Sequence, residues 1–214
     1  MTNSAFYEVL SARKLVPVIV LKELEDTVPT MAALRAGGLP VAEITFRTAC
    51  APDVIRVTRE QFPDMLVGAG TILNAAQAKE ALGAGAAFLV SPGFSPAVAD
   101  LCAERAIPYL PGCVTPTEIM AALERGISVV KFFPAEVYGG TKAIAAISAA
   151  FPGVRFMPTG GVSADNLTDY LDLPAVLACG GSWMMKGAPA EIAAKTAAAV
   201  SAIRAWSSAR GTAH

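Results

Sequence analysis

The feature that most constrains the fold of this 214-residue chain is a regular alternation of short apolar runs with longer alanine-rich amphipathic runs. The apolar runs have the length of buried strands, and the runs between them have the length and pattern of helices. The strand candidates are 16–21, 41–46, 65–69, 86–90, 107–110, 127–133, 154–158 and 175–179. The helix candidates are 25–36, 52–61, 75–83, 96–105, 117–125, 140–150, 164–171 and 189–206. Strands that alternate with helices in this way predict βαβ units and a parallel sheet.

A short internal repeat supports this organisation. The pattern AL-x-x-G occurs at 33–37, 81–85 and 122–126, each time just before a strand candidate. Alanine and leucine are suited to finish a helix face that packs on a sheet. We expect the glycine to take the left-handed conformation that ends the helix.

Eight βα units in 214 residues predict an α/β fold of the (β/α)8 type, a TIM barrel near the lower size limit of about 200 residues. An open doubly wound sheet is the alternative. Such a sheet usually carries GxGxxG after its first strand, and the segment "VIVLKELEDT" has no such motif. Residues 1–14 predict an extra N-terminal helix. Since no linker is visible, we expect 1–214 to form a single domain.

Composition and charge exclude several classes of protein. Hydrophobic residues make up 54% of the chain, and the formal net charge of −1 argues against a nucleic-acid partner. No run approaches the roughly 18 apolar residues of a membrane span, and the N-terminus does not resemble a signal peptide. The four cysteines lack CxxC spacing, which favours reduced thiols and a cytoplasmic location. The only histidine is His214, which excludes a histidine-based triad and a multi-histidine metal site.

The second strand candidate ends in "AEITFRT" and places polar side chains on one face. Because side chains alternate along a strand, Glu43, Thr45 and Arg47 point the same way, toward the inside of the predicted barrel. A carboxylate and a guanidinium in a barrel mouth are costly unless they are paired or used. A structural Glu43–Arg47 ion pair is the alternative to a catalytic role.

The sixth strand candidate lies in "SVVKFFPAEVYGG" and carries Lys131 inside an apolar run. If its apolar neighbours pack under helices, Lys131 points to the same interior as Glu43 and Arg47. A desolvated lysine near another cation loses its proton more easily, and the resulting amine can form a Schiff base with a ketone. The alternatives are a structural ion pair with a carboxylate, or a side chain that extends outward to solvent.

The last two strand candidates end in paired glycines. The segments are "MPTGGVSADN" and "ACGGSW", and the residues of interest are Thr159, Gly160, Gly161, Gly180, Gly181 and Ser182. The loops after strands 7 and 8 are the usual phosphate site of this fold, and glycine lets backbone N–H groups approach an anion closely. The sequence therefore predicts a phosphate site there.

Five further residues lie in a strand candidate or close to its end. Thr71, in "VGAGTIL", is a candidate donor to a carboxylate or carbonyl group, and Pro92, in "SPGFSP", is a candidate substrate contact. Cys113 and Cys179 have the pattern of small core residues. Trp183 either closes the site or packs on the rim of the barrel.

Taken together, these segments resemble the class I 2-keto-3-deoxy-6-phosphogluconate (KDPG) aldolase family, which is also known for 4-hydroxy-2-oxoglutarate aldolase activity. The resemblance covers nearly the whole chain, from "VPVIV" through "AEITFRT", "VGAGT", "SPGFSP", "VKFFPAE" and "RFMPTGGV" to "GGSW". The segments "KFFPAE" and "PTGG", in that order, are its most specific part.

The resemblance implies a role for each matching residue. Lys131 matches the Schiff-base lysine and Glu43 the general acid and base. The matching substrate-binding residues are Arg47, Thr71, Pro92, Phe133, Thr159, Gly160, Gly161, Gly181 and Ser182. The resemblance also implies a cytoplasmic homotrimer of the Entner–Doudoroff pathway that cleaves a phosphorylated keto acid and needs no metal or cofactor.

Three alternatives remain open at the level of sequence. The galactonate-series aldolase has the same chemistry and differs in the configuration of one carbon of its substrate. A sugar-phosphate isomerase or synthase would keep the glycine-rich loops but needs no interior lysine. A non-catalytic barrel that binds sugar phosphates needs neither Lys131 nor Glu43.

Overall fold

The structure is a computed structural model that describes residues 2–211. Within that range, strands and helices alternate along the chain. The strands are β1 (Leu15–Ile19), β2 (Val41–Thr45), β3 (Leu66–Gly70), β4 (Leu89–Val90), β5 (Tyr109–Leu110), β6 (Val129–Phe132), β7 (Arg155–Pro158) and β8 (Cys179–Gly181). The helices are α1 (Asn3–Arg13), α2 (Thr27–Ala36), α3 (Ala51–Gln61), α4 (Ala75–Gly83), α5 (Pro96–Glu104), α6 (Pro116–Leu123), α7 (Gly140–Ala150), α8 (Leu167–Leu171) and α9 (Pro189–Gly211). Short 3-10 helices, η1 (Leu24–Asp26) and η2 (Trp183–Met185), complete the described elements.

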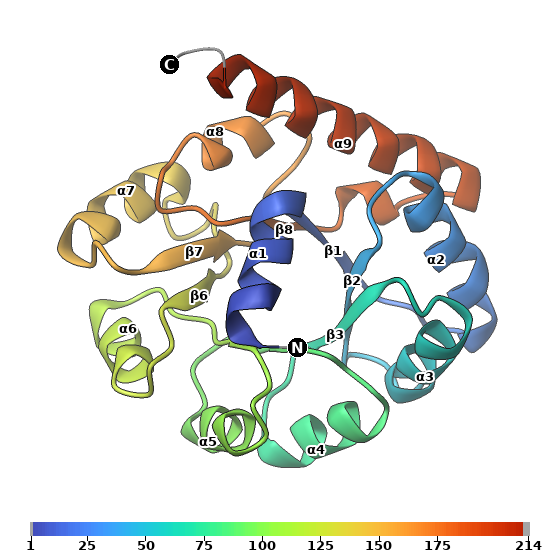
Figure 1. Ribbon diagram of the computed structural model, residues 1–214, viewed down its shortest axis with the longest axis horizontal. Helices are drawn as coiled ribbons and strands as arrows, with labels where there is room; N and C mark the ends of the chain where they lie inside the picture. Colours follow the sequence, from blue (N-terminus) through green and yellow to red (C-terminus); the bar gives the residue numbers. More distant parts are fainter. Residues whose placement is uncertain (1, 212–214) are drawn as a thin grey trace.

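All paired strands are parallel. Six of them form one sheet in the order β5-β4-β3-β2-β1-β8, and β6 pairs with β7. Isolated bridges join the two sheets, Gly112 with Lys131 on one side and Thr159 with Gly180 on the other. The fold is therefore α/β with a parallel, curled sheet. Figure 1 shows α2 to α9 arranged around the strands, with α1 lying across the centre of the ring.

The strands are apolar because both of their faces are covered, as parallel sheets require. All five residues of β2 are buried. Ala42 and Ile44 face outward, into a hydrophobic cluster that includes Leu34 of α2 and Val54 of α3. Glu43, which lies between them, faces the inside of the curled sheet. The alternation that the sequence predicts along this strand is therefore present.

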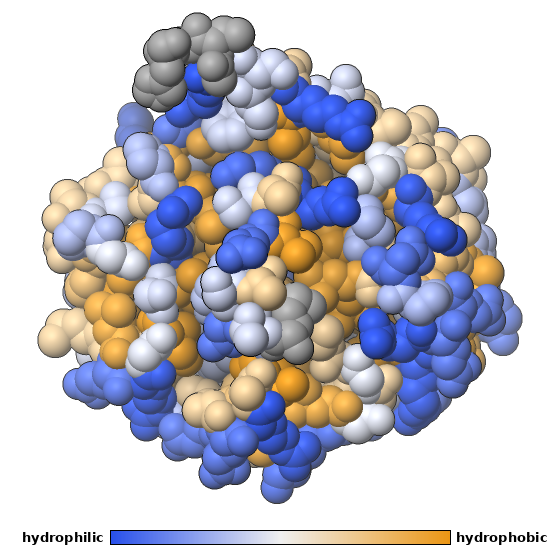
Figure 2. Space-filling view, viewed as in Figure 1, coloured by the Kyte–Doolittle hydropathy of each residue, from blue (hydrophilic) through white to orange (hydrophobic). Residues whose placement is uncertain are grey.

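Helix α1 covers the end of the sheet where the strands begin. The Thr2 hydroxyl caps the helix by accepting a hydrogen bond from the Ala5 N–H. Phe6 and Leu10 are fully buried, and the Phe6 ring centre lies 4.8 Å from that of Phe88, just before β4. Figure 2 shows this face with hydrophilic side chains along its lower rim and over its centre, and with apolar atoms between them.

Several boundaries differ from those expected. The candidate at 86–90 pairs only as Leu89–Val90, and the last strand is Cys179–Gly181 rather than 175–179. Its glycines are poor strand formers on composition alone, but they pair with Val16 and Pro17 of β1. The helix expected at 164–171 is only Leu167–Leu171.

The AL-x-x-G repeat ends its helices as expected at two of its three occurrences. Gly85 has φ +99° and Gly126 has φ +71°, both in the left-handed region. At the first occurrence the prediction is wrong: Gly37 is right-handed, and the next residue, Gly38, has φ +84°. Gly37 meets a different requirement, since a Cβ there would lie 2.5 Å from the Cβ of Thr196 in α9. It permits the close packing of α2 on α9.

Candidate active site

Lys131 and Glu43 form an ion pair inside the curled sheet. Lys131 Nζ donates to Glu43 Oε1 at 3.0 Å, and their side chains are 6% and 0% exposed. Lys131 lies on β6 and Glu43 on β2, which are not neighbours in the strand order, so the contact is made across the interior. Removing one partner of such a pair leaves a buried charge uncompensated. The expected alternative, a structural Glu43–Arg47 pair, is wrong, because Lys131 is the ion-pair partner of Glu43.

The Glu43 carboxylate is held in a tight space. Its second oxygen, Oε2, is buried and accepts no hydrogen bond from any residue between 2 and 211. A Cβ on Gly70 of β3 would lie 2.1 Å from Oε1, so glycine at 70 is what lets the carboxylate reach Lys131. A buried acceptor without a partner is unusual in a folded protein. Here it is an oxygen able to take a proton from a bound molecule.

Arg47 and Thr71 meet at the carboxyl ends of β2 and β3. Arg47 Nε donates to Thr71 Oγ1 at 3.3 Å. Thr71 has φ +58°, and a β-branched residue in the left-handed region is a strained outlier. Such strain is concentrated at functional sites, where the surrounding structure holds it in place. The two residues therefore present a cation and a hydroxyl next to each other.

Most of the predicted binding residues line one cavity of about 230 Å3 at the carboxyl ends of the strands. Its lining is Val18, Val20, Arg47, Phe133, Thr159, Gly160, Gly161, Val162, Gly181 and Ser182. Gly160 and Gly161 both have positive φ, +91° and +86°, which only glycine adopts readily. The cavity therefore combines an arginine at one side with two glycine loops and a serine at the other.

Phe133 and Thr159 connect this cavity to the ion pair. Lys131 Nζ lies 5.3 Å from the centre of the Phe133 ring, a distance at which the ring face attracts a cation. Thr159 is only 5% exposed and packs against Gly180. A Cβ on Gly180 would lie 2.3 Å from the hydroxyl oxygen of Thr159. The Phe133 ring also lies against Gly160, where a Cβ would be 3.2 Å from it, so this ring contacts both the amine and the glycine loop.

Pro92 is not part of this cavity. It lines a separate hollow of about 230 Å3 together with Ile72, Leu73 and Phe94. Its carbonyl group lies against Gly112, where a Cβ would be 2.0 Å from the oxygen. A direct contact of Pro92 with the same ligand as Arg47 therefore remains a prediction.

Trp183 packs on the rim and does not line the cavity. Its ring lies against Gly181, where a Cβ would be 1.9 Å from the ring, and it borders a groove with Leu167 of α8 and Ala199 of α9. Of the two alternatives from the sequence, the structure supports packing.

Sequence reasoning missed three residues beside the glycine loop. The carboxylate of Glu136, after β6, accepts hydrogen bonds from the Tyr170 hydroxyl and the Asn166 amide. Glu136 is the last residue of the "KFFPAE" segment and lies in the loop that follows Lys131 along the chain. Its place in that segment is a sequence signal that could have identified it. No local pattern marks Asn166 or Tyr170.

Three of the four cysteines, Cys102, Cys113 and Cys179, are buried in the core. Burial raises the pKa of both Cys102 and Cys113 to about 12, and it also raises the pKa of Cys179. A thiol must be deprotonated to act as a nucleophile or a metal ligand, so burial disfavours both roles for these three thiols. Among residues 2–211, no three His, Cys, Asp or Glu side chains come together in a group that could hold a metal ion.

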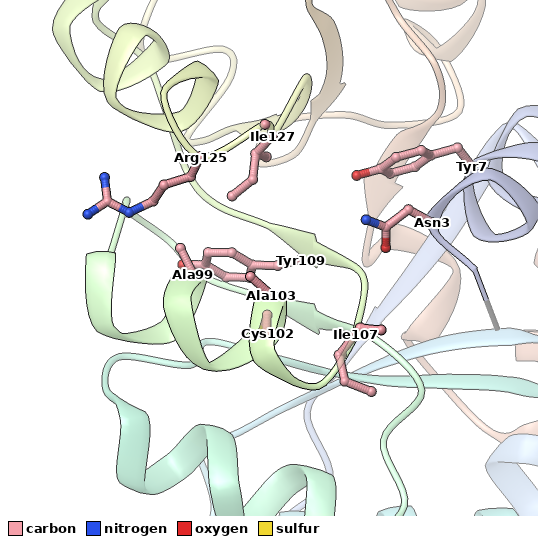
Figure 3. Close-up of a pocket in the computed structure, with 11 residues that line it drawn as sticks. Asn3, Tyr7, Ala99, Cys102, Ala103, Ile107, Tyr109, Arg125 and Ile127 are labelled. Atoms are coloured by element: carbon pink, nitrogen blue, oxygen red, sulfur yellow. The ribbon is translucent and has the colours of Figure 1, made fainter.

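Another hollow, of about 260 Å3, lies at the opposite end of the strands (Figure 3). It is bordered by Asn3 and Tyr7 of α1 and by Ile107 and Ile127, which precede β5 and β6. Arg125 at its edge is already paired with Asp100 at 3.0 Å. This hollow carries neither a lysine nor a carboxylate among its lining residues.

A curled parallel sheet with a buried lysine–carboxylate pair near a cavity lined by an arginine and two glycine loops is the arrangement of an α/β enzyme of the aldolase class. The chain belongs to the KDPG and KHG aldolase family, whose model matches residues 6–203. No helix of residues 2–211 is long and apolar enough to cross a membrane.

The sequence and the fold of this chain match those of known aldolases over most of their length. The chain is 49% identical to a 2-dehydro-3-deoxy-phosphogluconate aldolase of Treponema pallidum, over 84% of this chain and 85% of that protein. It is 48% identical to the KHG/KDPG aldolase of Escherichia coli K12, over 83% of each chain. It also matches a crystal structure of the Legionella pneumophila KDPG aldolase, with pyruvate captured as a covalent carbinolamine intermediate. That match has TM-score 0.84 and 39% identity, over 93% of this chain and 96% of the other.

Proposed function

We propose that this protein is a class I aldolase, a carbon–carbon lyase that cleaves KDPG to pyruvate and glyceraldehyde 3-phosphate. We further propose that it cleaves 4-hydroxy-2-oxoglutarate to pyruvate and glyoxylate, since one relative is named for both activities. The observation that carries the proposal is the buried Lys131–Glu43 pair beside a cavity lined by Arg47 and two glycine loops. A sugar-phosphate isomerase or a non-catalytic binding barrel needs no buried lysine at that place.

The first half of the reaction forms a Schiff base. Glu43 Oε1, 3.0 Å from Lys131 Nζ, takes the proton that the ammonium must lose. The neutral amine attacks the C2 ketone, and a proton passes from the nitrogen to the C2 alkoxide to give the carbinolamine. The protonated carboxyl group of Glu43 then gives its proton to the C2 hydroxyl. Water leaves, and a cationic iminium is formed that can accept an electron pair.

The second half breaks the carbon–carbon bond. The Glu43 carboxylate takes the proton of the C4 hydroxyl, the C3–C4 bond breaks, and its electron pair enters the iminium to give an enamine. Glyceraldehyde 3-phosphate leaves. Glu43 then protonates C3 of the enamine, and hydrolysis of the iminium releases pyruvate and the free lysine. One carboxylate serves both as base and as acid, in the way that general acid–base catalysis requires.

The remaining residues bind and orient. Arg47 and Thr71 hold the carboxylate of the pyruvyl part, while Gly160, Gly161, Gly181 and Ser182 receive the phosphate. Phe133 and Thr159 line the path between them, and Pro92 contacts the substrate from the neighbouring hollow. Fixing the ketone next to the amine in this way converts a bimolecular step into one within a complex and supplies part of the rate.

The finer features of the molecule belong to the same proposal. The two sheets and their bridges support a single-domain (β/α)8 barrel over 1–214, with α1 as the extra N-terminal helix. We propose a cytoplasmic homotrimer in the Entner–Doudoroff pathway that uses no metal or cofactor. Exposed apolar side chains such as Leu73, Met120 and Val137 offer surface for contacts between copies.

The proposal is tested by following pyruvate release from purified protein. The substrates are KDPG, its galactonate-series epimer and 4-hydroxy-2-oxoglutarate. We expect cleavage of KDPG and of 4-hydroxy-2-oxoglutarate, and loss of both on Lys131→Ala with the fold intact by circular dichroism. Faster cleavage of the galactonate epimer would assign the protein to the other series, and no pyruvate from any substrate would reject the proposal.

A further inference from the structure

The loop of Gly160 and Gly161 has no strong conformational preference of its own. Glycine has more backbone freedom than any other residue, so a loop built on two glycines is costly to order. Yet both residues are held at positive φ beside the cavity. If such a loop is to bind an anion through N–H groups held in fixed positions, contacts from another segment of the chain must order it. We call such a contact a brace.

Glu136 supplies that brace from the segment after β6. A Cβ on Gly161 would lie 2.2 Å from Glu136 Cγ, which shows that the stem of Glu136 packs directly on the glycine. The Glu136 N–H donates to the Gly160 carbonyl at 3.1 Å, and the preceding Ala135 N–H donates to Thr159 at 2.8 Å. The glycine loop is thereby joined to the strand that carries Lys131.

Two further side chains hold Glu136 and the loop together. The Asn166 amide nitrogen donates to the Gly161 carbonyl at 3.1 Å and to Glu136 Oε1 at 3.5 Å, while Asn166 Oδ1 accepts from the Ser163 N–H at 2.8 Å. Tyr170 is fully buried in α8, and its hydroxyl donates to the same Glu136 oxygen. Burial and this hydrogen bond raise the pKa of Tyr170, so the hydroxyl keeps its proton and remains a donor.

Glu136 cannot itself be a phosphate ligand, because two anions repel each other at short range. Its charge opposes anion binding, while its hydrogen bonds order the loop that binds the anion. These two effects have opposite signs, which makes them separable by experiment.

We propose that Glu136, fixed by Asn166 and Tyr170, is a positioning residue that holds the loop of Gly160 and Gly161 in the shape that receives the substrate's phosphate. The inference deepens the proposed function and rests on it. It makes Glu136 a determinant of specificity for phosphorylated over phosphate-free substrates. The reacting carbons lie at Lys131, outside the reach of this brace.

The test compares Glu136→Ala, Glu136→Gln and Tyr170→Phe on two substrates. For Glu136→Ala we expect the KM for KDPG to rise about tenfold, the ratio equivalent to about 1.4 kcal/mol, while kcat/KM for phosphate-free 4-hydroxy-2-oxoglutarate stays within about twofold. Glu136→Gln keeps an oxygen acceptor for Tyr170 and Asn166, so its KM for KDPG is expected to stay close to that of the wild type. Tyr170→Phe keeps the buried ring, loses one donor and is expected to change the KM in the same direction by less.

The matched control is Glu118→Ala. Glu118 also braces a loop by accepting backbone N–H groups, those of Val114 and Thr115, but that loop follows β5 and does not line the cavity. We expect Glu118→Ala to lower the melting temperature without changing the ratio of the two kcat/KM values. An equal effect of Glu136→Ala on both substrates would overturn the proposal and make Glu136 merely structural.

Calorimetric titration with inorganic phosphate separates this inference from the proposed function. If the wild-type protein cleaves neither substrate, the proposed function fails, and phosphate affinity alone then decides the role of Glu136. Positioning predicts weaker phosphate binding by Glu136→Ala and unchanged or tighter binding by Glu136→Gln, which removes the charge. Glu136→Ala binding phosphate as tightly as the wild type, or more tightly, would overturn it.

Discussion

Lys131 Nζ lies 3.0 Å from Glu43 Oε1, although 88 residues separate the two in the sequence. Glu43 is the only carboxylate that hydrogen-bonds this amine within residues 2–211, and the proposed reaction uses it as both general base and general acid. We predict that Glu43→Gln lowers kcat by about 10²- to 10⁴-fold, the usual contribution of general acid–base catalysis. Steady-state assays measure this, with exposed Glu124→Gln as the control. A Glu43→Gln enzyme with kcat near that of the wild type would assign the proton transfers elsewhere.

Gly70 determines whether Glu43 can reach Lys131. A Cβ at 70 would lie 2.1 Å from Glu43 Oε1, so Gly70→Ala must displace the carboxylate or the strand. We predict a loss of kcat together with a loss of about 1–3 kcal/mol of stability, typical of overpacking. Assays and urea unfolding measure both.

The chain provides a matched glycine for this prediction. Gly83 ends α4, and a Cβ there meets nothing within 4 Å. Gly83→Ala is expected to keep full activity and to gain up to about 1 kcal/mol from helix propensity. Equal activity of Gly70→Ala and Gly83→Ala would contradict the role given to Gly70.

Thr71 has a strained backbone conformation, and its hydroxyl accepts a hydrogen bond from Arg47. Its φ of +58° is costly for a β-branched residue, by about 1–3 kcal/mol. We predict that Thr71→Gly raises the KM, because Arg47 Nε loses its acceptor, while the melting temperature stays level or rises. Thr71→Ser keeps the hydroxyl and is expected to keep the KM. A clearly lower melting temperature for Thr71→Gly would show that the wild-type backbone is not strained there.

The lowered pKa of Glu118 makes the free energy of unfolding depend on pH. Burial alone would raise its pKa, but hydrogen bonds from the Val114 and Thr115 N–H groups and the Thr115 hydroxyl outweigh burial and lower it. A carboxyl group with a lowered pKa in the folded state stabilises the fold above its unfolded pKa of about 4.3. This contribution is lost as the pH falls through the lower, folded-state pKa.

We therefore expect Glu118→Gln to be less stable than the wild type at pH 7, and the difference to shrink as the pH falls below about 4.3. Denaturant unfolding of both proteins between pH 7 and pH 3 measures it. A difference that stays constant over this range would mean that the charge of Glu118 contributes nothing.

Strand alternation was enough to predict that Glu43 and Lys131 share an interior, because a two-residue period leaves only two faces and the apolar residues occupy one. The glycine loops were predictable for a similar reason, since they follow strands whose ends meet at one edge. The (β/α) alternation likewise predicted the parallel α/β fold.

Other features depend on contacts between distant segments and leave no local pattern. The strand Cys179–Gly181 is defined by its pairing with β1 rather than by its own composition. Gly37 is required by Thr196 of α9, and Gly161 is braced by Glu136. Tyr170 falls in an ordinary helical segment, and only the fold brings its hydroxyl to that carboxylate.

The proposed reaction depends above all on Lys131 acting as the nucleophile that forms a Schiff base with the keto acid. The most direct test is to incubate the protein with pyruvate and sodium borohydride and to locate the added mass by peptide mass spectrometry. We predict that the reduced pyruvyl adduct lies on Lys131 alone, that it also forms in Glu43→Gln, though more slowly, and that Lys131→Ala carries none. An adduct on another lysine, or no adduct in the wild-type protein, would contradict the account.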